Sequence, residues 1–459
     1  MRAALFAVLL GAQAARAGAA DWPLFDHDAA RSAVAGDLAI GRAGLAQLRA
    51  LWRIDLGDVA DSAPIVVGNR VYLTTRSGTT YALDSATGCV VWRFATHGPN
   101  ITTSVPAFDA SAGVLYVPGV DGAVHKLAPA GGSEMFGTGF PAPITLAPQT
   151  EKHASPLNLA NGYLYAQTAG YLSDEPPYAG HVVAIRLRDG AARVFNVLCS
   201  GHEALMDPHS CPAQRAGMWS RAGVVVDPDP AMGGRIYAAS GNGPYSAAAG
   251  NYSDSILALS RDGGRLIAAF TPSDYANLEA SDLDVGSSSP ALLPRQPDSA
   301  TPLLAVQGGK DGVLRLLDRA HLGGQGAALQ LISLGGRLLS APAVWRDRRG
   351  VSFVFVGLPD GVHAYRLRTR KGVSRLEAAW QAALPGRNEA TSPVVSDDLV
   401  VVATNGRLTV LDAHTGSELQ RSDTLGPIHW QSPSIANGTI YCPDETGALT
   451  AFSIGPIAH

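Results

Sequence analysis

The chain has 459 residues, of which 46% are hydrophobic and 16% charged, and its formal net charge is -4 at pH 7. This composition is typical of a packed globular protein, and the 51 glycines and 30 prolines predict many turns. The charges are scattered and form no basic stripe, which excludes a nucleic acid as the expected partner.

Residues 1–20 are typical of an export signal. Arg2 precedes the short apolar run Ala3–Ala12, and Ala15-Arg16-Ala17 fits a cleavage site. The run is shorter than the roughly 20 apolar residues that a transmembrane helix needs. No cysteine stands at the junction, so we expect no membrane anchor. The sequence predicts a mature protein of residues 21–459 that forms one domain in the periplasm or outside the cell.

A repeated unit occupies most of this mature chain. Residues 71–92 alternate apolar and polar positions in three runs separated by glycine turns, which predicts three strands of an antiparallel meander. The second run ends in Ala82-Leu83-Asp84. Similar elements recur at Lys126-Leu127, Ala184-Ile185, Ala258-Leu259, Leu316-Leu317-Asp318, Ala364-Tyr365, Val410-Leu411-Asp412 and Ala451-Phe452. Together these elements predict eight units.

A second marker, Ser-Pro or Ser-x-Pro, precedes this element in every unit except the fourth, as at Ser62-Ala63-Pro64. With hairpin turns such as Asp121-Gly122, it predicts blades of four antiparallel strands. Blades of this kind bury their apolar faces only against neighbours and must close into a ring. The last unit lacks an outer strand, whereas residues 51–55 form an additional strand before the first. We therefore predict an all-β fold, an eight-bladed β-propeller in which the N-terminal strand completes the last blade.

The repeat is elongated in the third to fifth units, most of all between Ile185 and Leu259. Long ordered insertions often carry function, so we expect the ligand face there. This region also contains Cys199 and Cys211, which are close enough in sequence to close one loop by a disulfide. The alternative for this pair is two buried thiols.

Five segments of these elongated units resemble the quinoprotein dehydrogenases, propellers that bind pyrroloquinoline quinone (PQQ) and a metal ion on their axis. The segments are Gly170–Ala184 with Glu175, Gly217–Gly223 with Trp219, Ala238–Pro244 with Asn242, Ala280–Gly286 with Asp282 and Asp284, and Gln307–Val313 with Lys310.

The resemblance implies a role for each of these residues. Glu175, Asn242, Asp282 and Asp284 would hold the metal, Trp219 and Lys310 would contact the quinone, and Asp282 would take the proton of an alcohol. Oxygen ligands suit a hard cation such as Ca²⁺, and the second aspartate, Asp284, resembles the lanthanide-type members. His429 and Trp430 open the last unit, and we expect them to face the axis, Trp430 as a further contact of the cofactor.

Each residue also has an alternative interpretation. Asn242 would suit a turn with positive φ, and Asp282 and Asp284 would cap a loop. Glu175 and Lys310 would be solvated loop residues. Trp219 would be a packing aromatic, and His429 with Trp430 would pack between blades.

The chain also departs from the resemblance, because it has no adjacent pair of cysteines and no haem-attachment motif. Two functional hypotheses follow. The first is a periplasmic oxidoreductase that oxidises a small alcohol or polyol with PQQ and a metal, and passes electrons to a separate acceptor. The second is a cofactor-free propeller that binds a protein partner, similar to the propeller of outer-membrane assembly.

Overall fold

The computed structural model describes residues 21–454 apart from 37–39, 100, 172–174 and 385–389. The export signal predicted for residues 1–20 lies outside this range. Among the described residues, no helix is long and apolar enough to cross a membrane.

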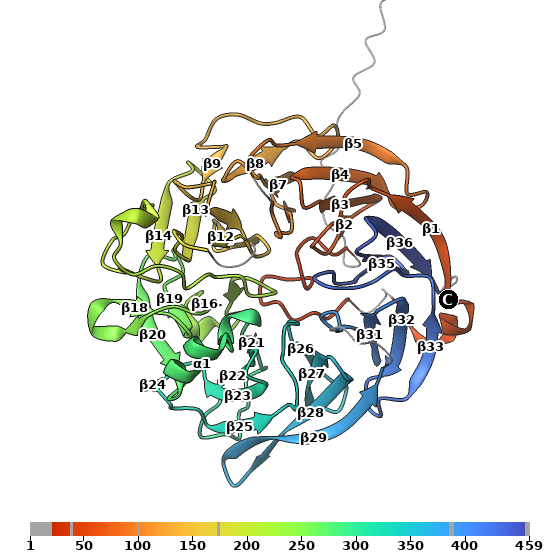
Figure 1. Cartoon of the computed structure of the whole chain (residues 1–459). Helices are drawn as coiled ribbons and strands as arrows, with labels where there is room; N and C mark the ends of the chain where they lie inside the picture. Colours follow the sequence, from red (N-terminus) through yellow and green to blue (C-terminus); the bar gives the residue numbers. More distant parts are fainter. Residues whose placement is uncertain (1–20, 37–39, 100, 172–174, 385–389, 455–459) are drawn as a thin grey trace, which may run out of the picture.

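Eight antiparallel sheets stand side by side in a ring, which confirms the predicted eight-bladed β-propeller (Figure 1). The blades and their strands are blade 1, β2 (Ile65–Val67), β3 (Arg70–Thr74), β4 (Thr79–Asp84) and β5 (Val90–Ala95); blade 2, β6 (Ala107–Asp109), β7 (Val114–Pro118), β8 (Ala123–Leu127) and β9 (Ala142–Pro143); blade 3, β10 (Glu151–His153), β11 (Asn158–Ala160), β12 (Tyr163–Gly170), β13 (His181–Arg186) and β14 (Ala192–Asn196); blade 4, β15 (Val225–Val226), β16 (Ile236–Ala239), β19 (Ile256–Leu259), β20 (Leu266–Thr271) and β24 (Gly324–Gln325); blade 5, β21 (Ala291–Leu292), β22 (Leu304–Gln307), β23 (Val313–Asp318) and β25 (Gln330–Ser333); blade 6, β26 (Ala343–Arg346), β27 (Ser352–Leu358), β28 (Gly361–Arg370) and β29 (Val373–Ala383); blade 7, β30 (Val394–Ser396), β31 (Leu399–Thr404), β32 (Arg407–Asp412) and β33 (Glu418–Ser422); blade 8, β34 (Ser434–Ala436), β35 (Thr439–Pro443), β36 (Ala448–Ser453) and β1 (Arg49–Asp55).

Two blades differ from the predicted four strands. In blade 3, β10 and β11 both pair with β12, because Ser155-Pro156 interrupts the inner strand and proline has no N–H for the ladder. In blade 4, β24 adds a parallel edge strand to β20. A short hairpin of β17 (Tyr245–Ser246) and β18 (Asn251–Tyr252) stands apart from the blades. The remaining elements are α1 (Tyr275–Ser281), η1 (Arg42–Gln47), η2 (Pro208–Ser210), η3 (Pro230–Met232), η4 (Ala247–Ala249) and η5 (Val285–Ser287).

The N-terminal strand closes the ring, as predicted. β1 pairs antiparallel with β36, with Ile54 opposite Leu449, so the first and last strands of the chain share blade 8 (Figure 1). This pairing covers the edge that β36 would otherwise expose.

Three tryptophans of outer strands dock one blade on the next. Their indole N–H groups donate to carbonyls of the following blade, Trp52 to Ser85 at 3.0 Å, Trp92 to Pro129 at 2.9 Å and Trp380 to Ala413 at 3.0 Å. The rings lie against Gly88, Gly132 and Gly416, where a Cβ atom would come within 3 Å of the indole. Glycine at these positive-φ positions is therefore required for both the turn and the close contact.

The segment of residues 21–35 crosses the ring on the face where the inner strands end. It runs through the centre of Figure 1 in red. Its backbone hydrogen bonds reach blade 1 (Trp22 to Val66), blade 2 (Pro23 to Phe108), blade 4 (Ala29 to Val226), blade 6 (Ser32 to Val344) and blade 7 (Ala33 to Val395). Blade 3 is joined through Arg31, which donates to the Leu157 carbonyl at 2.9 Å. We call residues 21–35 the axial segment.

Candidate active site in the axial cavity

A cavity of about 560 Å³ lies on the axis, because its walls come from blades on opposite sides of the ring. The charged or aromatic residues that line it are Asp61, Arg76, Lys152, Tyr171, Trp219, Arg221, Asp282, Lys310, Arg337, His429, Trp430 and Glu445. Five of them carry a positive charge and three are carboxylates. The set includes Trp219, Asp282, Lys310 and Trp430, and also His429, all singled out in the sequence.

The repeat explains why charged side chains meet here. In each blade, the residues ahead of the inner strand and the turn between the second and third strands lie on the same face of the ring. Asp284 and Lys310 hold these two positions in blade 5, Asp61 and Arg76 hold them in blade 1, and Glu445 holds the turn position in blade 8. Two opposite charges at these two positions of one blade therefore lie close enough to form an ion pair at the axial end of the blade.

On the wall formed by blades 4 and 5, Lys310 joins two aspartates. Its Nζ lies 2.6 Å from Oδ1 of Asp282 and 2.8 Å from Oδ1 of Asp284. Nδ2 of Asn242 donates to the same Asp282 oxygen at 2.8 Å. The structure thus brings Asn242, Asp282, Asp284 and Lys310 together, although they come from three separate stretches of chain.

The backbone shapes this cluster. Asp282 ends α1 in the left-handed region, with φ of 51°, and Asp284 comes directly before η5. The Asp284 side chain forms no capping hydrogen bond to η5. Asn242 is not among the residues with positive φ, so it is not the turn residue of the other interpretation. A Cβ on Gly286 would lie 2.5 Å from the backbone nitrogen of Gly241, so these glycines allow blades 4 and 5 to approach.

The cluster is strongly charged and partly sealed from water. Asp284 is 1% exposed, whereas the side chain of Asp282 is 67% exposed toward the cavity. Burial by itself lowers the pKa of Lys310, but Asp284 and Asp282 outweigh it and raise that pKa, so the amine stays charged. Behind the cluster, burial, with Asp284 and Glu279 nearby, raises the pKa of Asp254 to about 8. Asp254 therefore holds a proton at pH 7.

Aromatic rings border the charged cluster. The Lys310 ammonium lies 4.9 Å from the centroid of the Trp219 ring. Trp430 meets Trp219 edge-on, with centroids 5.6 Å apart, and His429 lies 4.7 Å from Trp430. The rings of Trp219 and Trp430 thus border the cavity instead of packing between the blades.

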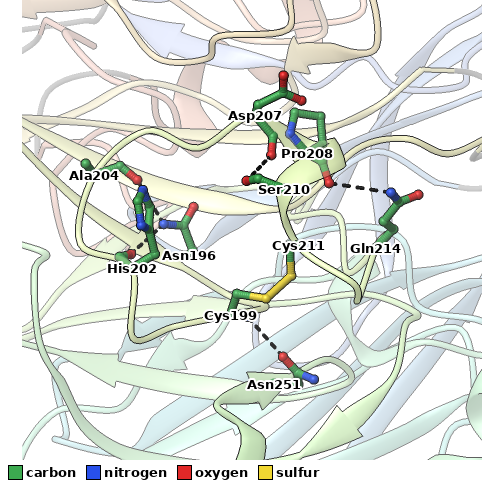
Figure 2. The surroundings of a disulfide bond; sticks show 10 residues. All are labelled: Asn196, Cys199, His202, Ala204, Asp207, Pro208, Ser210, Cys211, Gln214 and Asn251. Atoms are coloured by element: carbon green, nitrogen blue, oxygen red, sulfur yellow. Dashed lines mark hydrogen bonds between the residues drawn. A yellow bond between two sulfur atoms is a disulfide. The ribbon is translucent and has the colours of Figure 1, made fainter.

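A disulfide anchors the loop that leads to Trp219. Cys199 and Cys211 are joined after β14, and Figure 2 shows their surroundings. The Cys199 N–H donates to Oδ1 of Asn251 at 2.9 Å, and Nδ2 of Asn196 donates to the carbonyls of His202 and Ala204 at 2.7 and 3.0 Å. The bridge and these bonds fix both ends of an insertion that would otherwise lack support from a sheet.

The opposite wall, from blades 8 and 1, holds an ion-paired network. Nε of Arg76 lies 2.6 Å from Oδ2 of Asp61, and Nε2 of Gln431 donates to Oε1 of Glu445 at 2.6 Å. Asp61, His429 and Glu445 form, among the described residues, the one group of three whose metal-ligand atoms lie within 4.8 Å of one another. Because Arg76 and Gln431 already contact both carboxylates, this wall is a closed network and not an open metal site.

Glu175 does not join the other predicted ligands. It is exposed, precedes Pro176 and Pro177, and does not line the cavity. The chain returns to the interior only at Tyr178, which is 2% exposed. The geometry therefore supplies Asn242, Asp282 and Asp284 from one place, without Glu175.

The residues present fit a quinone cofactor with a hard cation. The amide oxygen Oδ1 of Asn242 is buried with no hydrogen-bond partner among the described residues, beside two aspartates. Oxygen donors of this kind suit calcium or a lanthanide. The aromatic rings, the positive side chains and a cavity of about 560 Å³ suit a flat polyanion such as PQQ.

These features define the class of the protein as an eight-bladed β-propeller with a charged axial cavity. Residues 45–143 and 362–455 match a PQQ-repeat family model described as outer membrane protein assembly factor BamB. The resemblance to the PQQ-binding-like propellers, expected from the sequence, is therefore confirmed.

Individual proteins with known names resemble the chain in part or in fold. A polyvinylalcohol dehydrogenase of Sphingopyxis sp. (strain 113P3) is 35% identical over 69 residues, which cover 15% of this chain and only 11% of that relative. A quinohemoprotein alcohol dehydrogenase from Pseudomonas putida HK5 superposes with a TM-score of 0.71 at 14% identity, over 96% of this chain and 81% of that one. A europium-containing methanol dehydrogenase superposes with a TM-score of 0.67 at 14% identity, over 95% and 98%. At these identities the two structures show a shared fold.

Proposed function

We propose that this protein is an exported, periplasmic oxidoreductase that oxidises an alcohol or polyol with PQQ and a bound metal ion. The observation that carries the proposal is that Asn242 and Asp284 contact, through Asp282 and Lys310, a cluster that lines the axial cavity beside Trp219. The named relatives are dehydrogenases of alcohols, which agrees with this reaction class.

The roles of the residues follow from their positions. Oδ1 of Asn242 and the carboxylates of Asp282 and Asp284 would hold a calcium or lanthanide ion, and Trp219 and Trp430 would contact the cofactor. When bound beside the metal, PQQ supplies the hydride acceptor. Lys310 would place its positive charge where negative charge develops during reduction.

Asp282 is the proposed base. Lys310 and Asn242 both contact its Oδ1, which fixes the carboxylate, while its side chain is 67% exposed and lines the cavity. A fixed carboxylate within reach of a bound hydroxyl can take its proton as hydride leaves the adjacent carbon. Electrons would then pass to a separate acceptor.

The test is a titration of the purified protein with PQQ in the presence of calcium or lanthanum, followed by quenching of tryptophan fluorescence. We expect saturable binding, at least tenfold weaker in Asp284→Asn and Asn242→Ala. Asp298→Asn is the matched control, because this exposed aspartate belongs to the same region but lies off the cavity. Dye-linked alcohol oxidation should be lost in Asp282→Asn.

Glu175 gives an additional comparison. Because it lies away from the cluster, we expect Glu175→Gln to bind metal and PQQ as the unaltered protein does. If Glu175→Gln loses metal or PQQ binding, Glu175 is a metal ligand after all.

A second candidate function is a cofactor-free scaffold for a protein partner. It is favoured by the match to the family model described as outer membrane protein assembly factor BamB. If the folded protein takes up neither PQQ nor metal, this candidate replaces the oxidoreductase.

A further inference from the structure

Four arginines of the described chain are almost completely buried, and they differ in how their charge is satisfied; one of them, Arg315, is 3% exposed and forms an ion pair with Asp311. Arg31 and Arg319 are each 2% exposed, and Arg221 is 6% exposed. A buried charge is costly unless it is paired and hydrogen-bonded, so the partners of each guanidinium show whether its environment is complete.

Arg319 has a complete set of partners. It forms two bonds with the Asp227 carboxylate, at 2.8 and 3.2 Å, and donates to the carbonyls of Leu293 and Leu304 at 2.7 and 2.8 Å. Arg31 has no ion pair among the described residues and its Nε has no partner, but it donates to the carbonyls of Phe25 and Leu157 at 2.6 and 2.9 Å and does not line the axial cavity. Both side chains therefore serve the fold.

Arg221 lacks such partners. Its one hydrogen bond within the described chain runs from Nη2 to Oγ of Ser432, at 3.3 Å, and no carboxylate there lies within ion-pair distance. Its charge is nevertheless present at neutral pH, because burial lowers the pKa of Arg221 only to about 10.

The nearest acidic groups do not compensate this charge. Asp61 is already bound to Arg76 at 2.6 Å. Burial raises the pKa of Asp26 to about 8, so that this carboxyl is protonated and neutral at pH 7. Arg221 is thus a buried cation whose counter-charge is not supplied by the residues around it.

The axial segment holds Arg221 in place. The guanidinium carbon lies 5.5 Å from the ring centroid of Phe25, and that ring is itself fully buried. Arg31 contacts the same ring at 5.9 Å. Phe25 therefore supports Arg221 from the side of the axial segment, while Arg221 lines the axial cavity on its other side.

We propose that Arg221 is an anion-binding residue of the axial cavity, which binds a carboxylate group carried by the bound ligand. A guanidinium with one weak bond retains donors for a two-point contact with a carboxylate. Arg221 is not among the residues that would hold the metal or contact the quinone; where the carboxylate belongs to the cofactor the inference rests on the proposed function, and where it belongs to a substrate the inference goes beyond it. The carboxylate can come from the cofactor or from an acidic substrate.

The experiment measures binding of two probes, citrate and PQQ, by calorimetry and tryptophan fluorescence. The neutral triethyl ester of citrate is the control ligand. Arg221→Gln should weaken binding of the probe that Arg221 contacts at least tenfold, which corresponds to about 1.4 kcal/mol. Arg348→Gln is the matched control, because Arg348 is 90% exposed and far from the cavity lining.

The pattern of results identifies the source of the carboxylate. A loss of PQQ affinity with citrate unaffected assigns it to the cofactor, and a loss of citrate affinity assigns it to an acidic substrate. If folded Arg221→Gln binds both probes as the unaltered protein does, or if the unaltered protein binds neither, the proposal is wrong. Because citrate binding needs no cofactor, this test remains decisive even where PQQ binding fails.

A conservative variant covers the case in which Arg221→Gln does not fold. Arg221→Lys keeps the charge but loses the planar fork, so we expect a folded protein with about threefold to tenfold weaker binding. Unchanged binding in this variant would also count against the proposal.

Discussion

The ring has two unlike halves. Blades 6, 7, 8, 1 and 2 are regular, contain the docking tryptophans Trp52, Trp92 and Trp380, and include the two stretches that match the family model. Blades 3 to 5 are elongated, contain the disulfide, α1 and the extra strands, and supply Trp219, Asp282 and Lys310. Both halves bring charged side chains to the axis; the regular half shows what the repeat needs in order to close, and the elongated half shows where it carries insertions.

The largest effect on stability should come from the cavity wall of the elongated half. Lys310→Met leaves the buried Asp284 without its ammonium partner, so we expect the free energy of unfolding to fall by about 4 kcal/mol. Denaturant unfolding measures the change. Lys371→Met, at an exposed turn of the regular half, should be neutral. Equal stability of the two variants would mean that the charged cluster contributes nothing to the fold.

In the regular half, the docking tryptophans should matter more than the cavity tryptophans. Trp380→Ala removes the indole from Gly416 and the hydrogen bond to Ala413, and should cost about 3 kcal/mol. Trp219→Ala removes a ring of the same size from the cavity wall and should cost clearly less. The comparison between halves breaks down if thermal unfolding ranks these two variants the other way.

The disulfide should stabilise the elongated half alone. Replacing Cys199 and Cys211 together by serine frees a loop with a sequence separation of 12, so we expect a loss of about 2.5 kcal/mol. Unfolding midpoints under oxidising conditions give the measurement. Cys89→Ser, at an exposed free cysteine, is the control. A double variant as stable as this control would show that the insertion is held by its hydrogen bonds.

The axial segment joins the halves and should make stability depend on pH. The pKa of Asp26 is raised to about 8 by burial, so the folded protein holds a proton that the unfolded chain releases above pH 4. This contribution is complete at low pH and is lost as the pH rises toward 8, by at most about 1.4 kcal/mol per pH unit.

Asp26→Asn should remove that part of the slope between pH 4 and pH 8, because an amide does not titrate. Asparagine also tolerates the φ of 51° at this position. Urea unfolding at a series of pH values measures the slope, with Asp28→Asn as the comparison at a neighbouring aspartate. Parallel curves for Asp26→Asn and the unaltered protein would exclude Asp26 as the source.

The ring was predictable from the sequence because each blade repeats its markers. The Ala82-Leu83-Asp84 element ends the third strand of blade 1, and its counterparts lie in the third strand of each of the other blades. The extra strands of blades 3 and 4 were missed, because β24 is two residues long and has no pattern of its own. In blade 3 the same Ser155-Pro156 that marked a strand start also splits the strand.

The site was predictable only in part. Asn242, Asp282, Asp284 and Lys310 were found through a resemblance, while Asp61, Arg76 and Glu445 were missed. A signal for two of the missed residues was present, since Asp61 precedes the inner strand and Arg76 lies in the turn between the second and third strands, as Asp284 and Lys310 do in blade 5. No sequence pattern could single out Arg221, because its interest depends on the absence of a carboxylate partner within the described chain, which only the structure shows. The place of Glu175 depends on the path of an irregular loop, which no repeat determines.

The pairing of β1 with β36 also sets the order of events during folding. Strand β1 is synthesised before blades 1 to 7 and its partner β36 after them, so blade 8 stays incomplete until the chain has been made as far as Ser453. A chain that stops before Ala448 can form none of this pairing and leaves two open sheet edges. Ring closure therefore depends on strand β36, since no chain that ends before this strand can complete blade 8.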